Sequence, residues 1–458
     1  MDVEILARIQ FALTIMFHYI YPPLSIGLGL ILVIIEGIYL KTKEPLYLKM
    51  AKFWTKVFAL TFAIGVATGI VMEFEFGTNW ATYSRYVGDV FGSALAAEGV
   101  FAFFLESGFL AILLFGWDRV GPKMHFFSTL MVCLGAHFSA IWIIVANSWM
   151  QTPAGFHIVG EGLNARAEII DFWAMVLNPS SVDRLIHAVI GAWLAGAFLV
   201  ISVSAYYMLK KKHHEFSRQS LKIGLTVALV ACVLQAFSGD SSAEVVAKHQ
   251  PMKLAAIEGV FKTQREAPFH LFGIVNKAEG RVDYALSIPK LLSYLSYGDT
   301  NAEVKGLDSI PKADWPNAPV VFQTYRLMVA LWAAMLIAAI WATILWRRGT
   351  LYTSPWMLKV LVVSVLFPQI ANQAGWVTAE MGRYPWIVHG LLRISEGLSK
   401  TVTAHQVLGS LILFTILYIA LFLVFLYLLN EKIKAGPEGT DLPTHYHQLS
   451  TYAEELHE

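Results

Sequence analysis

The chain has 458 residues, of which 56% are hydrophobic and 15% are charged, and its formal net charge is +1. Soluble domains carry about 25% charged residues, so this composition indicates an integral membrane protein and excludes an ordinary soluble enzyme. The near-neutral charge and the lack of a dense basic stretch exclude nucleic acid as an expected partner. The two cysteines lie in apolar runs without a CxxC or CxxCH pattern, so we expect neither a redox dithiol nor a covalently attached c-type haem.

Long apolar stretches recur along the whole chain. A transmembrane helix needs about 20 mostly apolar residues, and in chain order we expect such helices at residues 11–40, 57–76, 94–116, 125–146, 182–209, 223–240, 320–346, 360–378 and 403–430. Pro22 and Pro23 lie inside the first stretch, which predicts a kink or tilt there. The sequence therefore predicts an all-α membrane protein with nine transmembrane helices.

Positive charge is concentrated in alternate loops. Residues 41–56 contain five lysines and one glutamate, and the loops 117–124 and 210–222 and the segment after the seventh stretch are also basic. The positive-inside rule places these loops in the cytoplasm and the N-terminus outside. The predicted organisation is helices one to six in 1–240, an outer loop in 241–319, helices seven to nine in 320–430 and a cytoplasmic tail in 431–458.

Several ionisable or metal-binding side chains fall inside the apolar stretches. A charged group is costly in hydrocarbon, so such residues normally face a protein interior and act on ions, protons or cofactors. With the orientation above, five spans bring residues of this kind to a similar depth near the outer face. They are His18, Glu98, His187, Met328 and Glu380, with Glu106 about 12 Å deeper than Glu98 on the third span.

Each of these residues also has a purely structural interpretation. Glu98 and Glu106 could each form a structural ion pair with a basic side chain, although the third span offers no basic partner. On a regular helix the two glutamates lie about 80° apart. Glu380 and Arg383 are three residues apart and could be a helix-end salt bridge. Met328 could simply fill the core. Glu36, near the inner end of the first span, could reach the interface or meet a lysine of the next loop.

Several long strings resemble subunit I of the cytochrome bd-type quinol oxidases. They occur in the family's order and span essentially the whole chain. The strings are RIQFALTIMFHY (8–19), EFGTNWATYSRYVGDVFG (75–92), AAEGVFAFFLESGFLAILLFGWDR (96–119), WIIVANSWMQTPAG (142–155), KHQPMKLAAIEG (248–259), YRLM (325–328) and GWVTAEMGRYPW (375–386). The family fold, with nine transmembrane helices and an outer quinol loop, agrees with the predicted spans.

The resemblance implies haem ligands. His187 and Met328 match the axial pair of a low-spin, b558-like haem b, and Arg326 matches a basic residue beside it. His18 and Glu380 match the single ligands of two high-spin haems, one a b595-like haem b and the other a haem d or a further haem b. Which of these two residues binds which haem stays open.

The resemblance also implies catalytic residues. Glu98 and Glu106 match an acidic pair that handles protons near the oxygen-reducing haem, and Trp376 matches an aromatic between the haems. Lys253 and Glu258 match quinol-loop residues. Arg383 is kept in the string GRYPW, where Tyr384 replaces the glutamine of GRQPW and leaves the local hydrogen bonding open.

The predicted function is that of a terminal respiratory oxidase subunit in a bacterial or archaeal-type cytoplasmic membrane. It would oxidise quinol at the outer face, reduce oxygen to water and generate membrane potential. The family implies a homologous second subunit and, in part of its members, a small single-span subunit. The alternative is a proton- or ion-coupled transporter, which predicts inverted repeats that the sequence does not display.

Overall fold

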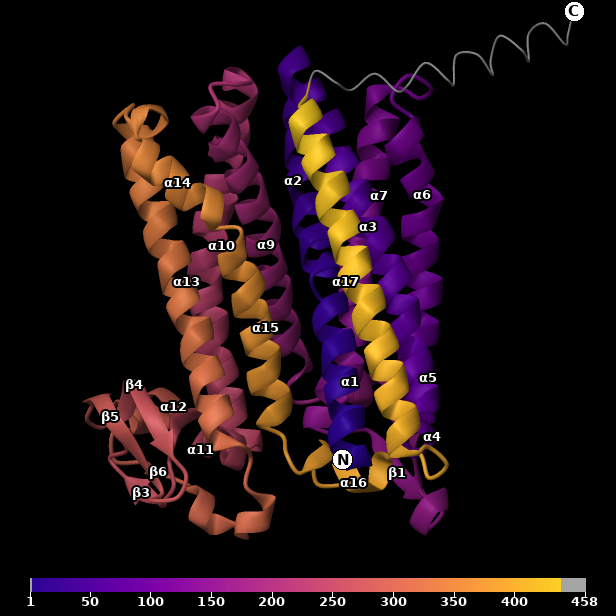
Figure 1. Cartoon of the computed structure of the whole chain (residues 1–458), viewed down its shortest axis with the longest axis vertical. Helices are drawn as coiled ribbons and strands as arrows, with labels where there is room; N and C mark the ends of the chain where they lie inside the picture. The colour runs from indigo at the N-terminus through magenta and orange to yellow at the C-terminus, as the bar shows by residue number, and fades with distance from the viewer. Residues whose placement is uncertain (1, 438–458) are drawn as a thin grey trace, which may run out of the picture.

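The computed structural model describes residues 2–437, and within them nine helical spans long and apolar enough to cross a membrane lie side by side (Figure 1). The predicted spans are thereby confirmed, and the helices extend beyond most predicted bounds. The spans are Val3–Thr42, Pro45–Thr78, Gly88–Phe115, Pro122–Gln151, Ser181–Leu209, His214–His249, Lys312–Arg347, Pro355–Met381 and Ala404–Ala435. Most of the predicted tail, from residue 438 onward, lies outside the described residues.

Three spans are interrupted rather than continuous. The first consists of α1 (Val3–His18) and α2 (Tyr21–Thr42), and the prolines predicted to kink it occupy the first turn of α2, where a missing N–H is tolerated. The third consists of α5 (Gly88–Glu98), a π-helical turn (Gly99–Phe103) and α6 (Phe104–Phe115). The eighth consists of α14 (Pro355–Val363) and α15 (Leu366–Met381).

The remaining spans are single helices. They are α3 (Pro45–Thr78), α7 (Pro122–Gln151), α9 (Ser181–Leu209), α10 (His214–His249), α13 (Ala318–Arg347) and α17 (Ala404–Ala435). Helix α9 is central, because it packs against α2, α7, α10, α14 and α15. A Cβ at Gly27 of α2 would lie 2.4 Å from the Ala192 carbonyl oxygen of α9, so only glycine permits this approach.

Short helices and four two-stranded antiparallel sheets occupy one end of the molecule, the end that also carries the N-terminus (Figure 1). The largest hairpin, β4–β5, lies in the predicted outer loop, which we call the Q-loop (241–319). The Q-loop begins as the last turns of α10 and continues into α11 (Pro251–Glu258) and α12 (Leu291–Tyr297). The strands are β1 (Phe156–Val159), β2 (Arg166–Ile169), β3 (Gln264–Arg265), β4 (Phe269–Asn276), β5 (Arg281–Ile288), β6 (Glu303–Val304), β7 (Trp386–Val388) and β8 (Leu392–Arg393). The other short helices are α4 (Ala81–Tyr86), α8 (Phe172–Val176) and α16 (Ile394–Gly397).

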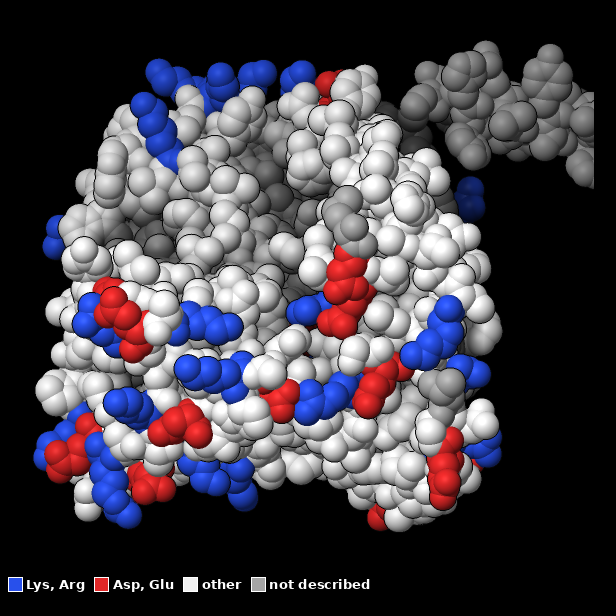
Figure 2. Space-filling view, turned by 60° about the horizontal axis from the view of Figure 1, so that its bottom comes forward, with Lys and Arg blue, Asp and Glu red and all other residues white. Residues whose placement is uncertain are grey.

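The two ends differ in charge. Figure 2 shows acidic and basic side chains intermixed over the Q-loop end, whereas mainly Lys and Arg gather along the opposite edge. The structure therefore keeps the charge asymmetry on which the predicted orientation rests.

Candidate functional site

His187 and Met328 lie in neighbouring parts of one helix cluster, formed by α9, α10, α13 and α15. His187 Nδ1 is 3.0 Å from the Ser238 hydroxyl, and such a contact would orient the ring and leave Nε2 available to a metal. The Gln235 amide nitrogen lies 3.0 Å from Nε2, so this amide would have to turn aside if His187 bound iron as predicted. A Cβ at Gly375 of α15 would lie 2.9 Å from Met328 Sδ, so glycine keeps the space around the thioether open.

A buried ion pair connects the Q-loop to this cluster. The Arg326 guanidinium, two residues before Met328, donates to Glu258 Oε2 at 2.6 Å. It also donates to the backbone carbonyls of Ile257 and His270. Burial raises the pKa of Glu258, and the charge and hydrogen bond of Arg326 oppose that rise. The Q-loop is thus fixed to the predicted low-spin haem site by a carboxyl that can take up a proton.

His18 ends α1, where the first span breaks. Its Nδ1 lies 2.9 Å from the Thr68 hydroxyl of α3. A Cβ at Gly69 would lie 3.2 Å from its Cε1, so the ring lies close to α3. The next residue, Tyr19, packs edge-on against Trp376 with ring centroids 5.3 Å apart. Trp376 therefore lies directly beside the His18 site.

Glu380 lies at the end of α15 among donors from α7, from α9 and from the turn that follows α15. Its Oε2 accepts from Arg383 at 2.6 Å, so the predicted helix-end salt bridge is present. Its Oε1 accepts from Asn147 at 3.1 Å and from Gln151 at 3.2 Å, both on α7. Arg184 of α9 reaches within 4.0 Å of the same oxygen. This carboxylate is oriented by far more than one helix-end contact.

Positive charge exceeds negative charge around Glu380. We call Arg184, Arg383 and Lys253 the basic cluster. Lys253 is buried, and desolvation together with Arg184 and Arg383 lowers its pKa well below the usual value. Arg184 Nε and Arg383 Nη1 are buried without a hydrogen-bond partner among the described residues. Unpaired buried donors beside three basic side chains and one carboxylate indicate that further anionic groups belong here.

The propionate groups of haem fit this requirement, because they bring carboxylates close to the iron ligand. Among residues 2–437, no three His, Cys, Asp or Glu side chains gather to hold a bare metal ion. His18 and Glu380, each predicted as a single ligand, would suit an iron that is already held by a porphyrin. The residues present therefore fit bound haem.

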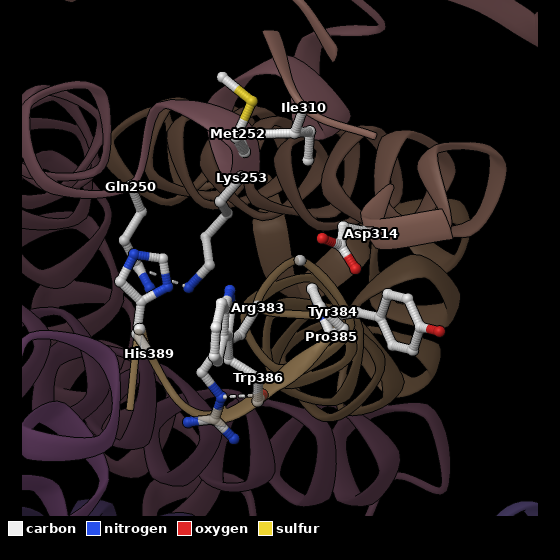
Figure 3. A pocket seen from close by; sticks show the side chains of 12 residues that line it. Gln250, Met252, Lys253, Ile310, Asp314, Arg383, Tyr384, Pro385, Trp386 and His389 are labelled. Atoms are coloured by element: carbon white, nitrogen blue, oxygen red, sulfur yellow. Dashed lines mark hydrogen bonds between the residues drawn. The ribbon is translucent and has the colours of Figure 1, made fainter. Parts of the chain in front are cut away.

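A cavity of about 280 Å³ borders the basic cluster at the Q-loop end. Figure 3 shows the Lys253 amine and the His389 ring on one side of it and Asp314 and Tyr384 on the other. Lys253 donates to Gln250 at 2.7 Å and also to Gln151.

The structure separates two residues that the sequence had grouped together. Lys253 and Glu258 lie on the same short helix, α11. Lys253 points to Gln151 and the basic cluster, whereas Glu258 binds Arg326 beside Met328. The assignment of both to one quinol-binding function stays a prediction.

Glu98 and Glu106 both face α7. Glu98 Oε1 accepts from Ser139 at 2.5 Å, and Glu106 is buried with its Cβ against Gly135. The expected angle of about 80° assumed a regular α-helix and is wrong here, because the π turn at Gly99–Phe103 lies between them. A π turn has more residues per turn, so it reduces the rotation between the two carboxylates.

Two local expectations can now be resolved. Glu36 neither reaches the interface nor meets a lysine, since it is buried and lies 3.0 Å from His125 Nδ1. Arg383 donates to Glu380 and to the Trp386 carbonyl, so these bonds do not depend on the side chain at position 384. Tyr384 instead lies 5.4 Å from the Arg8 guanidinium.

Arg184 and His125 were not singled out from the sequence. Arg184 is three residues before His187 on α9, a spacing that puts both on one helix face. This spacing could have identified Arg184 as a candidate site residue. His125 offered no comparable signal, because its partner Glu36 is 89 residues away in the chain.

Comparison with known proteins decides the family. The profile of cytochrome bd terminal oxidase subunit I matches residues 6–437. The chain belongs to this family. It is 40% identical over 444 residues to cytochrome bd ubiquinol oxidase subunit 1 of Bacillus subtilis (strain 168), covering 95% of this chain and 94% of that one. It is 34% identical to cytochrome bd-II ubiquinol oxidase subunit 1 of Escherichia coli (strain K12), covering 96% and 98%.

A solved structure agrees with this assignment. The bd oxidase from Geobacillus thermodenitrificans superposes with a TM-score of 0.88 at 32% identity, covering 95% of this chain and 99% of that one. The chain is therefore a multi-pass, haem-dependent terminal oxidase subunit of the bacterial cytoplasmic membrane. The transporter alternative finds no support.

Proposed function

We propose that this subunit oxidises quinol at its Q-loop end and passes the electrons inward for the reduction of oxygen to water. The observation that carries this proposal is the buried Glu258–Arg326 pair, which joins the Q-loop to the helix of Met328. The relatives in B. subtilis and E. coli are named ubiquinol oxidases, which supports a quinol substrate. The quinone type stays open.

The haems would be held by the ligands that the sequence predicts. His187 and Met328 hold the low-spin haem b, and Arg326 lies beside it. His18 and Glu380 are the single ligands of two high-spin haems, a b595-like haem b and a haem d or a further haem b. These groups supply one-electron transfer and oxygen binding. Trp376 lies between the His18 site and Arg184, which approaches its ring to 5.7 Å.

The chain itself handles the protons. Glu258 accepts a proton from quinol, because burial raises its pKa and makes its carboxylate a stronger base than an exposed one. Glu106 and Glu98 deliver protons to the haem at which oxygen is reduced. The basic end opposite the Q-loop is the cytoplasmic one, so protons released and protons consumed come from opposite sides. This separation generates membrane potential.

The basic cluster has a different role from Glu258. Arg184, Arg383 and Lys253 supply the donors for propionate groups in the Glu380 pocket, since two of their nitrogens lack partners. This assigns Lys253 to a haem pocket in addition to the quinol-loop function that the family resemblance implies.

Assembly follows the family. Cytochrome bd oxidases work with a subunit II and use quinol and oxygen. A small single-span subunit is a further expected partner.

Glu258→Gln tests the quinol function. The amide keeps the size of the side chain but cannot accept a proton, so quinol oxidation should slow by about 100-fold. Oxygen consumption from an artificial donor that reduces the haems directly should stay near wild type. Equal loss with both donors would contradict the proposal. Glu279→Gln, at an exposed Q-loop position, is the matched control and should change neither rate.

A further inference from the structure

A second buried carboxylate site lies far from the Q-loop, between α2 and α7. His125 Nδ1 is 3.0 Å from Glu36 Oε2, and Thr129 donates to Glu36 Oε1 at 2.8 Å. His125 Nε2 is 3.2 Å from the Leu113 carbonyl oxygen of α6. Each side chain of the pair is only 4% exposed. We call Glu36, His125 and Thr129 the inner triad.

These contacts show how many protons the pair holds. A carbonyl oxygen only accepts, so Nε2 of His125 carries a hydrogen and donates it to Leu113. The short contact between Nδ1 and Glu36 needs one further proton, on either the nitrogen or the carboxyl oxygen. Both arrangements are neutral overall, which makes the pair tolerable in an apolar interior. The pair therefore contains one proton that two atoms share.

The inner triad lies in line with Glu106. Leu113 is seven residues beyond Glu106 on the same helix, or about 10 Å along the axis. On α7, Thr129 is six residues from Gly135, which packs against the Glu106 Cβ. Ser139, the donor to Glu98, follows four residues later. Helix α7 thus contacts the buried carboxyls of Glu36 and Glu106 and the half-buried carboxyl of Glu98 in succession along its length.

The other side of the triad is close to the basic end. The Trp117 ring lies over the His125 ring with centroids 3.8 Å apart. Lys52 lies 5.7 Å from the centroid of the same tryptophan. Trp117 is only partly buried and is followed by the exposed residues Asp118 and Arg119. A single aromatic layer therefore separates the buried pair from the charged surface.

We propose that the inner triad is the proton intake relay for Glu106. The proposal rests on the proposed oxidase function, in which O₂ + 4e⁻ + 4H⁺ gives 2H₂O. Two quinols supply the four electrons and release four protons at the Q-loop end, so the four consumed protons must come from the basic end. Each proton enters beside Trp117 and joins the pair. The pair releases one proton toward Glu106, and a few waters at hydrogen-bond spacing would cover an axial distance like the ~10 Å from Leu113 to Glu106 on α6.

The competing explanation is that these contacts only hold α2 and α7 together. Glu36→Gln distinguishes the two explanations, because glutamine can still donate to His125 and accept from Thr129 but cannot carry a transferable proton. Haem spectra and the reduction of the low-spin haem by quinol should match wild type. The charge-moving phase after oxygen binds should slow by about tenfold or more. Glu36→Asp, which restores the carboxyl, should recover most of the rate.

Ser128→Ala is the matched control, since Ser128 is buried on α7 and its hydroxyl donates to the Met124 carbonyl of its own helix. It should leave the charge-moving phase unchanged. If Glu36→Gln fails to accumulate, His125→Gln provides the same test, because its amide can still bond Glu36. A wild-type charge-moving phase in either variant would overturn the proposal. If Glu106→Gln alone slows this phase, the oxidase function stands and only the intake relay fails.

Discussion

At the scale of single residues, the hydrogen-bond partners of two buried Q-loop side chains distinguish their roles. Glu258 and Lys253 are five residues apart, yet one binds Arg326 and the other lies with Gln151 in the basic cluster. Sequence motifs located both residues. The motifs could not distinguish the roles of Glu258 and Lys253, because their partners Arg326 and Gln151 come from distant parts of the chain.

Met328→Leu tests the low-spin site. Leucine nearly preserves the volume but removes the thioether, so the low-spin haem should lose its sixth ligand and its midpoint potential should shift. Reduced-minus-oxidised spectra and a redox titration measure this. Met335→Leu, at a fully packed position of the same helix, should give wild-type values. An unaltered low-spin band in Met328→Leu would remove Met328 from the ligand set.

Lys253→Gln tests the basic cluster. Glutamine keeps a donor toward Gln250 but removes the charge that would meet a propionate. The high-spin haem bands should weaken or shift while the low-spin band stays near wild type, and the quinol KM should rise only to the extent that Lys253 also serves quinol. Spectra of the purified protein and steady-state kinetics decide between the two roles. A raised KM with normal high-spin bands would assign Lys253 to quinol instead.

The pH profile of quinol oxidation tests Glu258. A base must be ionised to accept a proton, and a carboxyl is ionised above its pKa. Because burial raises the pKa of Glu258, the rate should fall on acidification at a higher pH than an ordinary carboxyl would allow. Stopped-flow reduction of the low-spin haem across pH measures this limb. It should vanish in Glu258→Gln, and its persistence there would point to another base.

At the scale of elements, composition predicts the spans well but not their irregular turns. Long apolar stretches force helices, because backbone groups in a bilayer must be hydrogen-bonded internally. The prolines of the first span also indicate its break. The π turn at Gly99–Phe103 has no such marker. It changes which face carries Glu106, so the two carboxylates could not be aligned from a regular helical wheel.

Insertion of one alanine after Val100 tests the alignment of the two carboxylates across the π turn. The extra residue should rotate Glu106 relative to Glu98 by about 100°, so the two carboxylates can no longer both face α7. Oxygen consumption should fall by about tenfold or more, while membrane insertion and the low-spin haem spectrum are kept. Val100→Ala, at an exposed position, keeps the length and should behave like wild type. A fully active insertion variant would show that the alignment is unnecessary.

At the scale of the whole molecule, the sites lie toward the Q-loop end and the inner triad lies toward the basic end. The helices that carry His18, His187, Met328 and Glu380 could be predicted from the apolar stretches, and the common depth of these residues stays a prediction. The basic cluster and the inner triad could not, because their members come from helices far apart in sequence and meet only through helix packing. Arg184 and His125 are the clearest examples.

The central claim is that quinol electrons enter a haem held by His187 and Met328 at the Q-loop end and leave to oxygen at the high-spin haems. Anaerobic stopped-flow mixing of the purified oxidase with quinol, followed by oxygen, tests it most directly. The account predicts rapid reduction of a low-spin haem b by quinol, followed by oxidation that begins at the high-spin haems. If quinol reduced the high-spin haems at the wild-type rate in a variant that lacks the low-spin haem, this result would contradict the account.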